Sequence, residues 1–289
     1  MPVKKRVPNK TTKKTENTSR GLPDVSLPTE VSEPCESLGD FSMLLFGAKK
    51  IGKTTMCAQF PKALFLMFEP GGKALSVYQR RVKTWEEFKA YIKLLKKDST
   101  FKTIVIDTAD IMYELCFDYV CRKLVISHPS EESWGKGWRD IKQEMYSQVN
   151  ELLNLEKGVI FISHVTQRTI TRRDGFEYDV VESSMPKQAR EVIEGLVDLW
   201  VLYDYQGSKR TLTIQGDDHV DSGHRIQGRF TYPDGEPIRS IDMGGSAKEA
   251  FQRFTLAFNN KLEKSKGGTD DGKGVVKKIK KGVVKKIKK

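Results

Sequence analysis

Short apolar runs alternate along residues 41–258 with longer segments in which apolar side chains recur every three or four positions. Short apolar runs predict buried strands, and the longer spacing predicts amphipathic helices. The expected strands are 42–46, 63–68, 103–106, 159–162 and 199–203, and the expected helices are 54–60, 85–97, 109–125, 138–155 and 189–196. Strands alternating with helices predict an α/β fold with a mostly parallel sheet covered by helices on both faces. Residues 210–215 and 225–231 are expected to pair as a hairpin after the fifth strand.

The flanking segments differ from this core in composition. Residues 1–40 are rich in Lys, Thr, Ser, Pro and Glu, and residues 259–289 end in two copies of the octapeptide GVVKKIKK. Neither segment has enough apolar surface to offset the entropy of ordering, so both are predicted to be disordered around a folded core at 41–258.

Most of the net charge of +12 lies in these flanking segments. Residues 1–20 carry a net +6, residues 21–40 a net −5, residues 41–260 a net +2 and residues 261–289 a net +9. Basic ends suit polyanions through counterion release, so the tails are expected to gather nucleic acid or an acidic-tailed single-strand-binding protein. The alternative is a solvated end that binds nothing in particular.

Hydrophobic residues make up 38% of the chain, and no apolar run approaches the 18 or so residues that span a bilayer. The basic start lacks an apolar run that would make it a secretory signal. The four cysteines include no C-x-x-C pair, which favours a reducing, cytoplasmic location without disulfides or a cysteine metal site.

The most specific motif follows the first expected strand and matches G-x-x-x-x-G-K-[ST] in full. Its residues are Gly47, Ala48, Lys49, Lys50, Ile51, Gly52, Lys53, Thr54 and Thr55. Backbone N–H groups of such a loop, together with the helix start, surround phosphate oxygens. We expect Lys53 to reach the β- and γ-phosphates of ATP, Thr54 to ligate Mg²⁺ and Thr55 to contact the α-phosphate. A chance match in a loop is the alternative, and the strand before it and the helix after it argue against that.

Three polar residues follow later strands of the predicted sheet. Asp107 ends the run 103–106 and is expected to hold the water shell of Mg²⁺. Glu69 lies just past the second strand, where it is placed to activate the attacking water, although a solvated turn residue is an equal alternative. His164 ends the fourth strand, where it can sense a γ-phosphate or be purely structural. Asp110 is either a helper of Asp107 or an acid in the first turn of a helix.

This succession of residues resembles the RecA-type ATPase core over about residues 41–230. It is most similar to short phage nucleotide-binding proteins that act in single-strand annealing and recombination. The resemblance implies that Glu69 is the catalytic base and that His164 takes the sensor position, where RecA itself has Gln. Most AAA+ proteins place a catalytic Glu directly after the acid of the third strand, whereas this chain has Thr108.

The resemblance also implies a homo-oligomer, as a ring or filament, and two loops that contact single-stranded DNA. The corresponding stretches are 127–139 and 165–185, and the candidate DNA contacts are Trp134, Lys136, Arg168, Arg172, Arg173 and Phe176. The alternatives are tryptophans packed under a helix start and arginines in a solvated loop. A basic residue inserted into the neighbour's ATP site is expected among Lys209, Arg210, Arg225 and Arg229.

These features predict an ATP-binding and ATP-hydrolysing RecA-like protein, phage-encoded and acting in the host cytoplasm, that binds single-stranded DNA in annealing or recombination. The alternatives are a replicative helicase-like motor or loader, a small-molecule kinase and a nucleotide-gated binding module without significant hydrolysis. ATP turnover that depends on DNA would favour the RecA-like ATPase over the kinase and the binding module.

Overall fold

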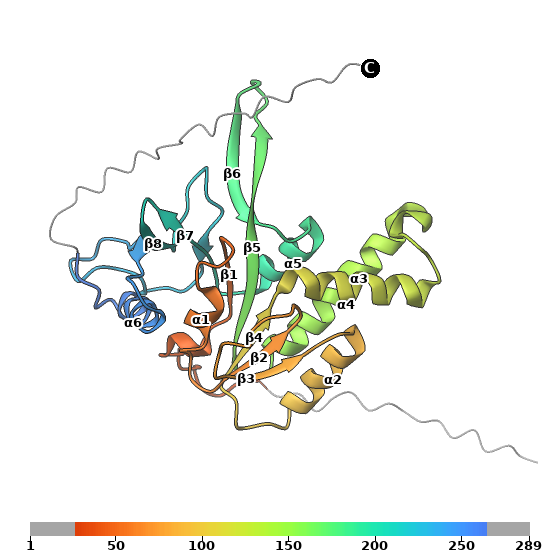
Figure 1. The fold of residues 1–289 in the computed structure, drawn as a ribbon, viewed down its shortest axis with the longest axis horizontal. Coiled ribbons are helices and arrows are strands. Elements are labelled where there is room, and N and C mark those ends of the chain that lie inside the picture. The colour runs from red at the N-terminus through yellow and green to blue at the C-terminus, as the bar shows by residue number, and fades with distance from the viewer. Residues whose placement is uncertain (1–26, 265–289) are drawn as a thin grey trace, which may run out of the picture. The chain divides into compact units, whose positions relative to one another are not determined.

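The computed structural model describes residues 27–264 (Figure 1). The disorder expected for 1–26 and 265–289, including the GVVKKIKK repeats, falls outside the described residues. Residues 27–34 contain no helix or strand, and a compact unit begins at Cys35. Its first element is a 3-10 turn, Leu38–Asp40, whose Leu38 is buried although it precedes the expected start of the core. Among the described helices, none is long and apolar enough to cross a bilayer.

Five parallel strands form the centre of the sheet, as the sequence predicts. They are β1 (Met43–Gly47), β2 (Ala63–Met67), β4 (Thr103–Asp107), β5 (Gly158–Thr171) and β7 (Leu199–Gln206), side by side in the order β7-β1-β5-β4-β2. A short exposed strand, β3 (Tyr78–Arg81), adds an edge beside β2. The sequence analysis missed β3 because its residues, Tyr-Gln-Arg-Arg, have no apolar run.

The sheet continues beyond β7 with antiparallel strands. β8 (Lys209–Thr213) pairs with β7 across a two-residue turn, and β10 (Ser240–Asp242) pairs with β8. The expected hairpin between 210–215 and 225–231 is therefore wrong. The tight turn contains Gly207 at φ 64°, which lets the chain fold straight back onto β7. Residues 225–231 form no strand. The short strand just before them, β9 (Gly223–His224), pairs with β7.

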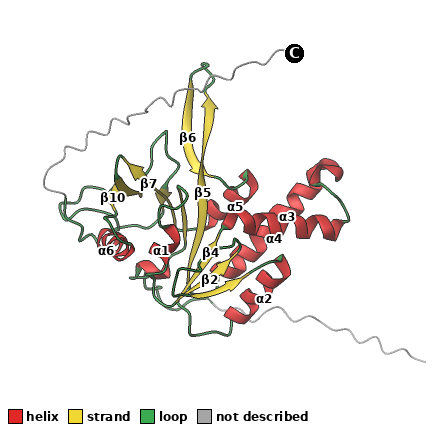
Figure 2. Ribbon diagram, viewed as in Figure 1, coloured by secondary structure: helices red, strands yellow, loops and turns green. Residues whose placement is uncertain are grey.

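Helices cover both faces of the sheet (Figure 2). On one face α2 (Trp85–Leu95), α3 (Ala109–Leu124), α4 (Lys136–Leu153) and α5 (Lys187–Leu196) share a core with Leu64 and Leu66 of β2. On the other face α1 (Lys53–Cys57) and α6 (Ala247–Phe258) share a core with Phe65. Neighbouring strand residues thus point to opposite cores, which explains why the central strands are apolar throughout. The fold class is the expected one.

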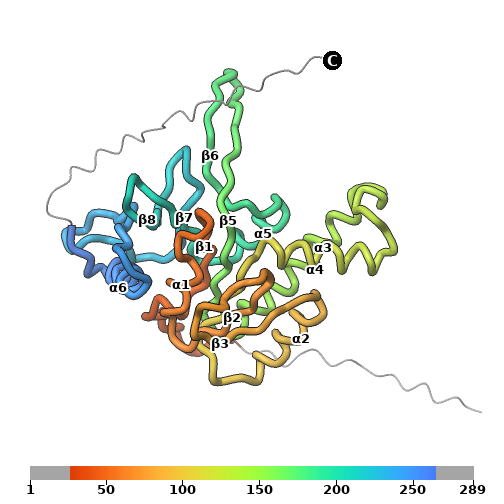
Figure 3. The backbone as a smooth tube through the Cα atoms, in the orientation of Figure 1, coloured from red at the N-terminus to blue at the C-terminus, as the bar shows by residue number. Residues whose placement is uncertain are grey.

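The stretch 165–185 is not the loop that we expected. β5 runs on past the sheet and pairs with β6 (Glu177–Ser183) as a two-stranded ribbon that projects from the molecule (Figures 1 and 3). The high content of β-branched residues at 165–171, with Gly175 at φ 83° in the turn, favours a hairpin over a loop. We refer to residues 165–183 as the β5–β6 ribbon.

Gly158, the first residue of β5, offers a test of this packing. A Cβ at Gly158 would lie 1.9 Å from the carbonyl oxygen of Gly39, a backbone atom that cannot swing away. We expect Gly158→Ala to lower the free energy of unfolding by about 1–3 kcal/mol, measured by chemical denaturation. Gly195→Ala in α5 is the matched control, because a Cβ there meets nothing within 4 Å and helix propensity improves. Equal stability of the two variants would contradict the described approach of β5 to Gly39.

Candidate active site

The loop after β1 has the backbone of a phosphate cradle. Gly52 adopts φ 108° and Lys50 φ 63°, so the chain reverses between β1 and α1. Ile51 is buried in the core and anchors the loop, while Lys49 and Lys50 are exposed and Ala48 is half-buried. No side chain fits at Gly47, because a Cβ would lie 1.9 Å from the carbonyl oxygen of Tyr203 on β7.

Lys53 points into this loop. Its side chain is only 6% exposed, and its Nζ donates hydrogen bonds to the carbonyl oxygens of Gly47 at 2.8 Å and Ala48 at 2.9 Å. Burial lowers the pKa of Lys53, and the charges of Asp107 and Asp110 oppose that effect. Thr55 donates to the carbonyl oxygen of Gly52 at 2.8 Å. The loop thus holds a buried cation inside a turn lined by backbone groups.

Thr54 and Asp107 meet beside Lys53. The Thr54 hydroxyl donates to Oδ2 of Asp107 at 2.8 Å, and Asp107 is 8% exposed. Burial raises the pKa of Asp107, against the hydrogen bond from Thr54, which lowers it. A hydroxyl and a carboxylate side by side are hard oxygen ligands of the kind that Mg²⁺ prefers. The donor set therefore fits the metal that the sequence motif implies.

Glu69 and His164 lie together at the same edge of the sheet. The His164 Nε2 is 3.7 Å from Oε1 of Glu69, and the Thr108 hydroxyl donates to that oxygen at 2.6 Å. The peptide bond between Asp107 and Thr108 is cis. The register explains the convergence, since Gly47 is opposite His164 and Asp107 is opposite Met67. Thr108 was not assigned a role from the sequence, although its position directly after Asp107 indicates that it lies at the candidate site.

Asp110 connects the site to the β5–β6 ribbon. Its Oδ1 accepts a hydrogen bond from the hydroxyl of Ser184, just past β6, and the Ser184 N–H donates to the carbonyl oxygen of His164. Asp110 also begins the first turn of α3, as one of the two sequence-based interpretations has it. The ribbon is therefore bonded at its base to both sides of the candidate site.

The candidate DNA residues of the ribbon differ in their surroundings. At the base of the ribbon, Arg168 is neutralised by Glu182, because the Arg168 Nε lies 3.0 Å from both carboxylate oxygens of Glu182. Near the tip, the Arg172 guanidinium lies 5.7 Å from the ring centre of Phe176 and 5.0 Å from that of Tyr178, and it also pairs with Asp218 at 3.2 Å. Arg173 is exposed in the turn.

The second candidate DNA stretch forms the turn between α3 and α4. Trp134 is 99% exposed there, in a left-handed conformation at φ 56°, so it does not pack under a helix start. Lys136 begins α4 and lies 3.4 Å from both Glu132 and Asp140, which partly neutralise it.

The candidate trans-acting residues lie in four different settings. Lys209 pairs with Asp242 at 3.3 Å. Arg225 donates to the carbonyl oxygens of Glu194 and Gly195 at the end of α5, and the Arg229 guanidinium lies 4.6 Å from the ring centre of Phe258. Both arginines thus serve contacts within the chain. Arg210 lies beside the phosphate loop of its own chain.

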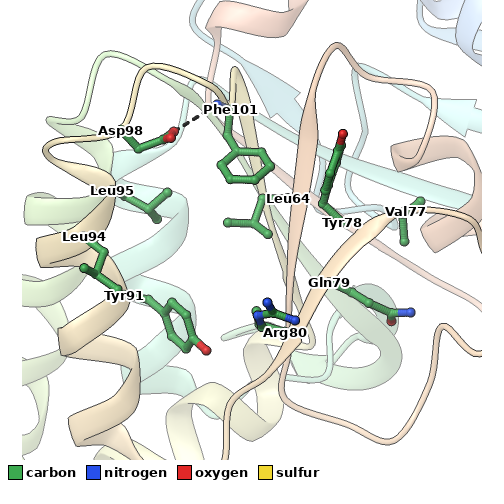
Figure 4. A pocket seen from close by; sticks show the side chains of 10 residues that line it. All are labelled: Leu64, Val77, Tyr78, Gln79, Arg80, Tyr91, Leu94, Leu95, Asp98 and Phe101. Carbon is green, nitrogen blue, oxygen red and sulfur yellow. Dashed lines mark hydrogen bonds between the residues drawn. The ribbon is translucent and has the colours of Figure 1, made fainter.

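A separate hollow of about 440 Å³ lies at the edge of the sheet, between β3 and α2 (Figure 4). We call it the β3–α2 groove. Its lining is mostly apolar and aromatic: Leu64, Val77, Tyr78, Gln79, Arg80, Tyr91, Leu94, Leu95, Asp98 and Phe101. No residue of the phosphate loop contributes to it.

The loop after β1, the acid at the end of β4 and the order β7-β1-β5-β4-β2 together define a P-loop NTPase with a RecA-like core. The chain belongs to the AAA domain family, whose family model matches residues 40–226. In this member the residue after Asp107 is Thr108, which is bonded to Glu69 of the adjacent strand.

Known proteins resemble the chain more distantly. The SPbeta prophage-derived uncharacterized protein YorG of Bacillus subtilis (strain 168) is 27% identical over 145 residues, which are 48% of this chain and 45% of that protein. The match thus spans less than half of that relative. The KaiC-like protein PH0186 of Pyrococcus horikoshii OT3 is 16% identical with a TM-score of 0.40, covering 71% of this chain and 87% of that one. The RadB recombinase is 14% identical with a TM-score of 0.38, covering 74% and 90%.

The buried carboxylate of Asp107 is expected to favour Mg²⁺ binding while it lowers the stability of the nucleotide-free protein. Because burial raises its pKa, the folded protein favours the protonated acid, and stability falls as pH rises from the unfolded pKa through the folded one. We expect Asp107→Asn to raise the unfolding temperature of the nucleotide-free protein at pH 8, with a difference that shrinks toward pH 4. The same variant should lose the Mg²⁺-dependent part of nucleotide binding. The difference in unfolding temperature between Asp107→Asn and the wild type should be larger at pH 8 than at pH 4. A smaller or negative difference at pH 8 would contradict this explanation.

Proposed function

We propose that this protein binds ATP with Mg²⁺ and hydrolyses it, and that hydrolysis is coupled to single-stranded DNA. The observation that carries the proposal is the convergence of Lys53, the Thr54–Asp107 pair and the Glu69–His164 pair at the carboxyl ends of four adjacent strands. In parallel α/β sheets this edge is where ligands bind. Membership in the AAA domain family agrees with a nucleotide-binding role.

The chemistry divides among the residues as follows. Lys53 and the backbone of the loop neutralise the phosphates, and Thr54 and Asp107 hold Mg²⁺, which supplies charge stabilisation between the β- and γ-phosphates when bound. Glu69 orients and deprotonates the attacking water, with Thr108 fixing its carboxylate at 2.6 Å. His164 ends the part of β5 that lies within the central sheet, and from there it contacts the γ-phosphate.

Single-stranded DNA would bind at the tip of the β5–β6 ribbon. Phe176 is exposed and stacks on Tyr178 with ring centres 6.4 Å apart, and Arg172 lies over both rings. Aromatic faces stack on bases while arginine pairs with phosphates, a combination suited to single strands. The exposed Trp134 supplies a second stacking surface. Annealing or recombination is the role that we propose for this activity, and a prophage-derived relative agrees with a phage origin.

ATP hydrolysis with and without single-stranded DNA tests this function. We expect DNA to stimulate turnover by the wild type, and we expect Lys53→Ala and Glu69→Ala to lower kcat by about 10²–10⁴-fold. Arg172→Ala combined with Phe176→Ala should weaken DNA binding by about 10-fold or more and remove the stimulation, while DNA-free turnover is retained.

Lys248→Ala, which removes one exposed positive charge in the first turn of α6, is the control for the ribbon variant. ATP binding with negligible hydrolysis, which neither DNA nor Glu69→Ala changes, would favour a nucleotide-gated binding module. Turnover that depends on a metabolite rather than DNA would favour a kinase, and robust strand unwinding would favour a motor.

We also propose that copies of the chain assemble through the β3–α2 groove. β3 is an edge strand whose outer backbone groups lack a partner strand among the described residues, and Tyr78 and Leu94 beside it are 60% and 65% exposed. An edge strand next to an apolar hollow is a surface that another chain can extend. A second copy in this groove would give an open, head-to-tail assembly or a ring.

Leu94→Glu should therefore shift the protein toward monomers in sedimentation velocity, because it places a charge in the apolar contact. Leu256→Glu on α6 is the matched control, since Leu256 is also exposed but lies away from the groove. The unfolding temperature should be the same for both variants. An unchanged mass distribution in Leu94→Glu would exclude the groove as the assembly surface.

A further inference from the structure

Arg210 is positioned by two neighbouring strands beside the phosphate loop. It lies at the start of β8, directly opposite Tyr205 on β7, and β7 in turn places Tyr203 opposite Gly47 on β1. The side chains of Tyr205 and Tyr203 lie near the guanidinium and raise the pKa of Arg210. Because both strands belong to the same sheet as β1, the side chain has a fixed place relative to the loop of its own chain.

The charge of Arg210 has no carboxylate partner among the described residues. Lys209, its sequence neighbour, pairs with Asp242, and Arg168, Arg172 and Arg190 each pair with an acid. The groups near Arg210 are instead Tyr205 and Tyr203, whose neutral hydroxyls leave its charge in place. A fixed guanidinium without a counter-anion is suited to bind an anionic group of a ligand.

The nearest part of the phosphate loop is its last glycine. A Cβ on Gly52 would lie 3.8 Å from Nη1 of Arg210 and 3.1 Å from Oγ1 of Thr55. Thr55 is the residue expected at the α-phosphate. A hollow of about 450 Å³ adjoins Arg210, and its other lining residues are Tyr205, Ser208, Lys209, Asp242, Gly244 and Gly245.

We infer that Arg210 acts in cis: it binds the α-phosphate side of the nucleotide held by its own phosphate loop, and does not enter the site of a neighbouring subunit. This inference rests on the proposed function, because it needs a nucleotide in the loop. It differs from the sequence-based expectation, which placed Arg210 among the residues that act on a neighbour. The hollow beside Tyr205 then receives the nucleoside end of the ligand.

Equilibrium binding of ADP and ATP tests the inference. Since both ligands carry the α-phosphate, Arg210→Ala should weaken both by the same factor of about 10 or more, which is the loss of one charge-assisted hydrogen bond. Arg210→Lys should recover part of the affinity. Arg239→Ala, at an exposed arginine before β10, is the matched control and should bind ADP as the wild type does.

Mixing Arg210→Ala and Lys53→Ala proteins separates cis from trans action, at an ATP concentration low enough that the weakened binding of Arg210→Ala limits its turnover. In a cis site, the mixture hydrolyses no more ATP than the two proteins do separately, because no subunit has both residues. Recovery of activity in the mixture would overturn the inference, since a trans residue is supplied by the neighbour. Normal ADP binding by Arg210→Ala would overturn it too, while loss of binding in Lys53→Ala alone would leave the proposed function standing. Absence of ADP binding in the wild type would overturn both.

Discussion

The parallel register of β1, β2, β4 and β5 is the constraint on which the candidate site depends. It brings the carboxyl ends of four strands to one edge, so that a buried lysine and two carboxylates from distant parts of the sequence become neighbours. Burial of Lys53 disfavours its charge, and the negative charges of Asp107, Asp110 and Glu69 oppose that effect. The carboxylates thus favour the protonated ammonium of Lys53 against the effect of its burial. A triphosphate with Mg²⁺ would supply the remaining anion and cation that such a cluster accommodates.

The same strand that ends at this site also leaves it as the β5–β6 ribbon. β5 carries His164 at the level of Gly47 and continues without a break to Thr171, so the site and the ribbon share one rigid element. The hydrogen bonds of Ser184 to Asp110 and His164 close this connection from β6. A change in the position of His164 on nucleotide binding would therefore move the base of the ribbon directly. Under the proposed function, this arrangement would give a physical route by which DNA at the tip and ATP at the base affect one another.

Much of the core could be predicted from the sequence because its strands are apolar on both faces and its helices have a regular spacing. The phosphate loop was also predictable, since its glycines, Lys53 and Thr54 have a fixed order in the chain. The edge strand β3 was not, because a strand with exposed polar residues has no apolar signal. The β5–β6 ribbon was taken for a loop because most residues from 166 to 177 are exposed, which removes the contrast between buried and exposed positions. The partnership of Thr108 with Glu69 and the place of Arg210 depend on contacts between strands, which sequence spacing alone does not reveal.

The central claim is that the segment between β1 and α1 holds a triphosphate through Lys53. A calorimetric titration of the full chain with Mg²⁺–ATP, beside the Lys53→Ala protein, measures this most directly. The account predicts saturable binding with one site per chain for the wild type and a loss of affinity of at least 100-fold for Lys53→Ala. Equal affinities of the two proteins, or no heat of binding for a folded wild type, would contradict it.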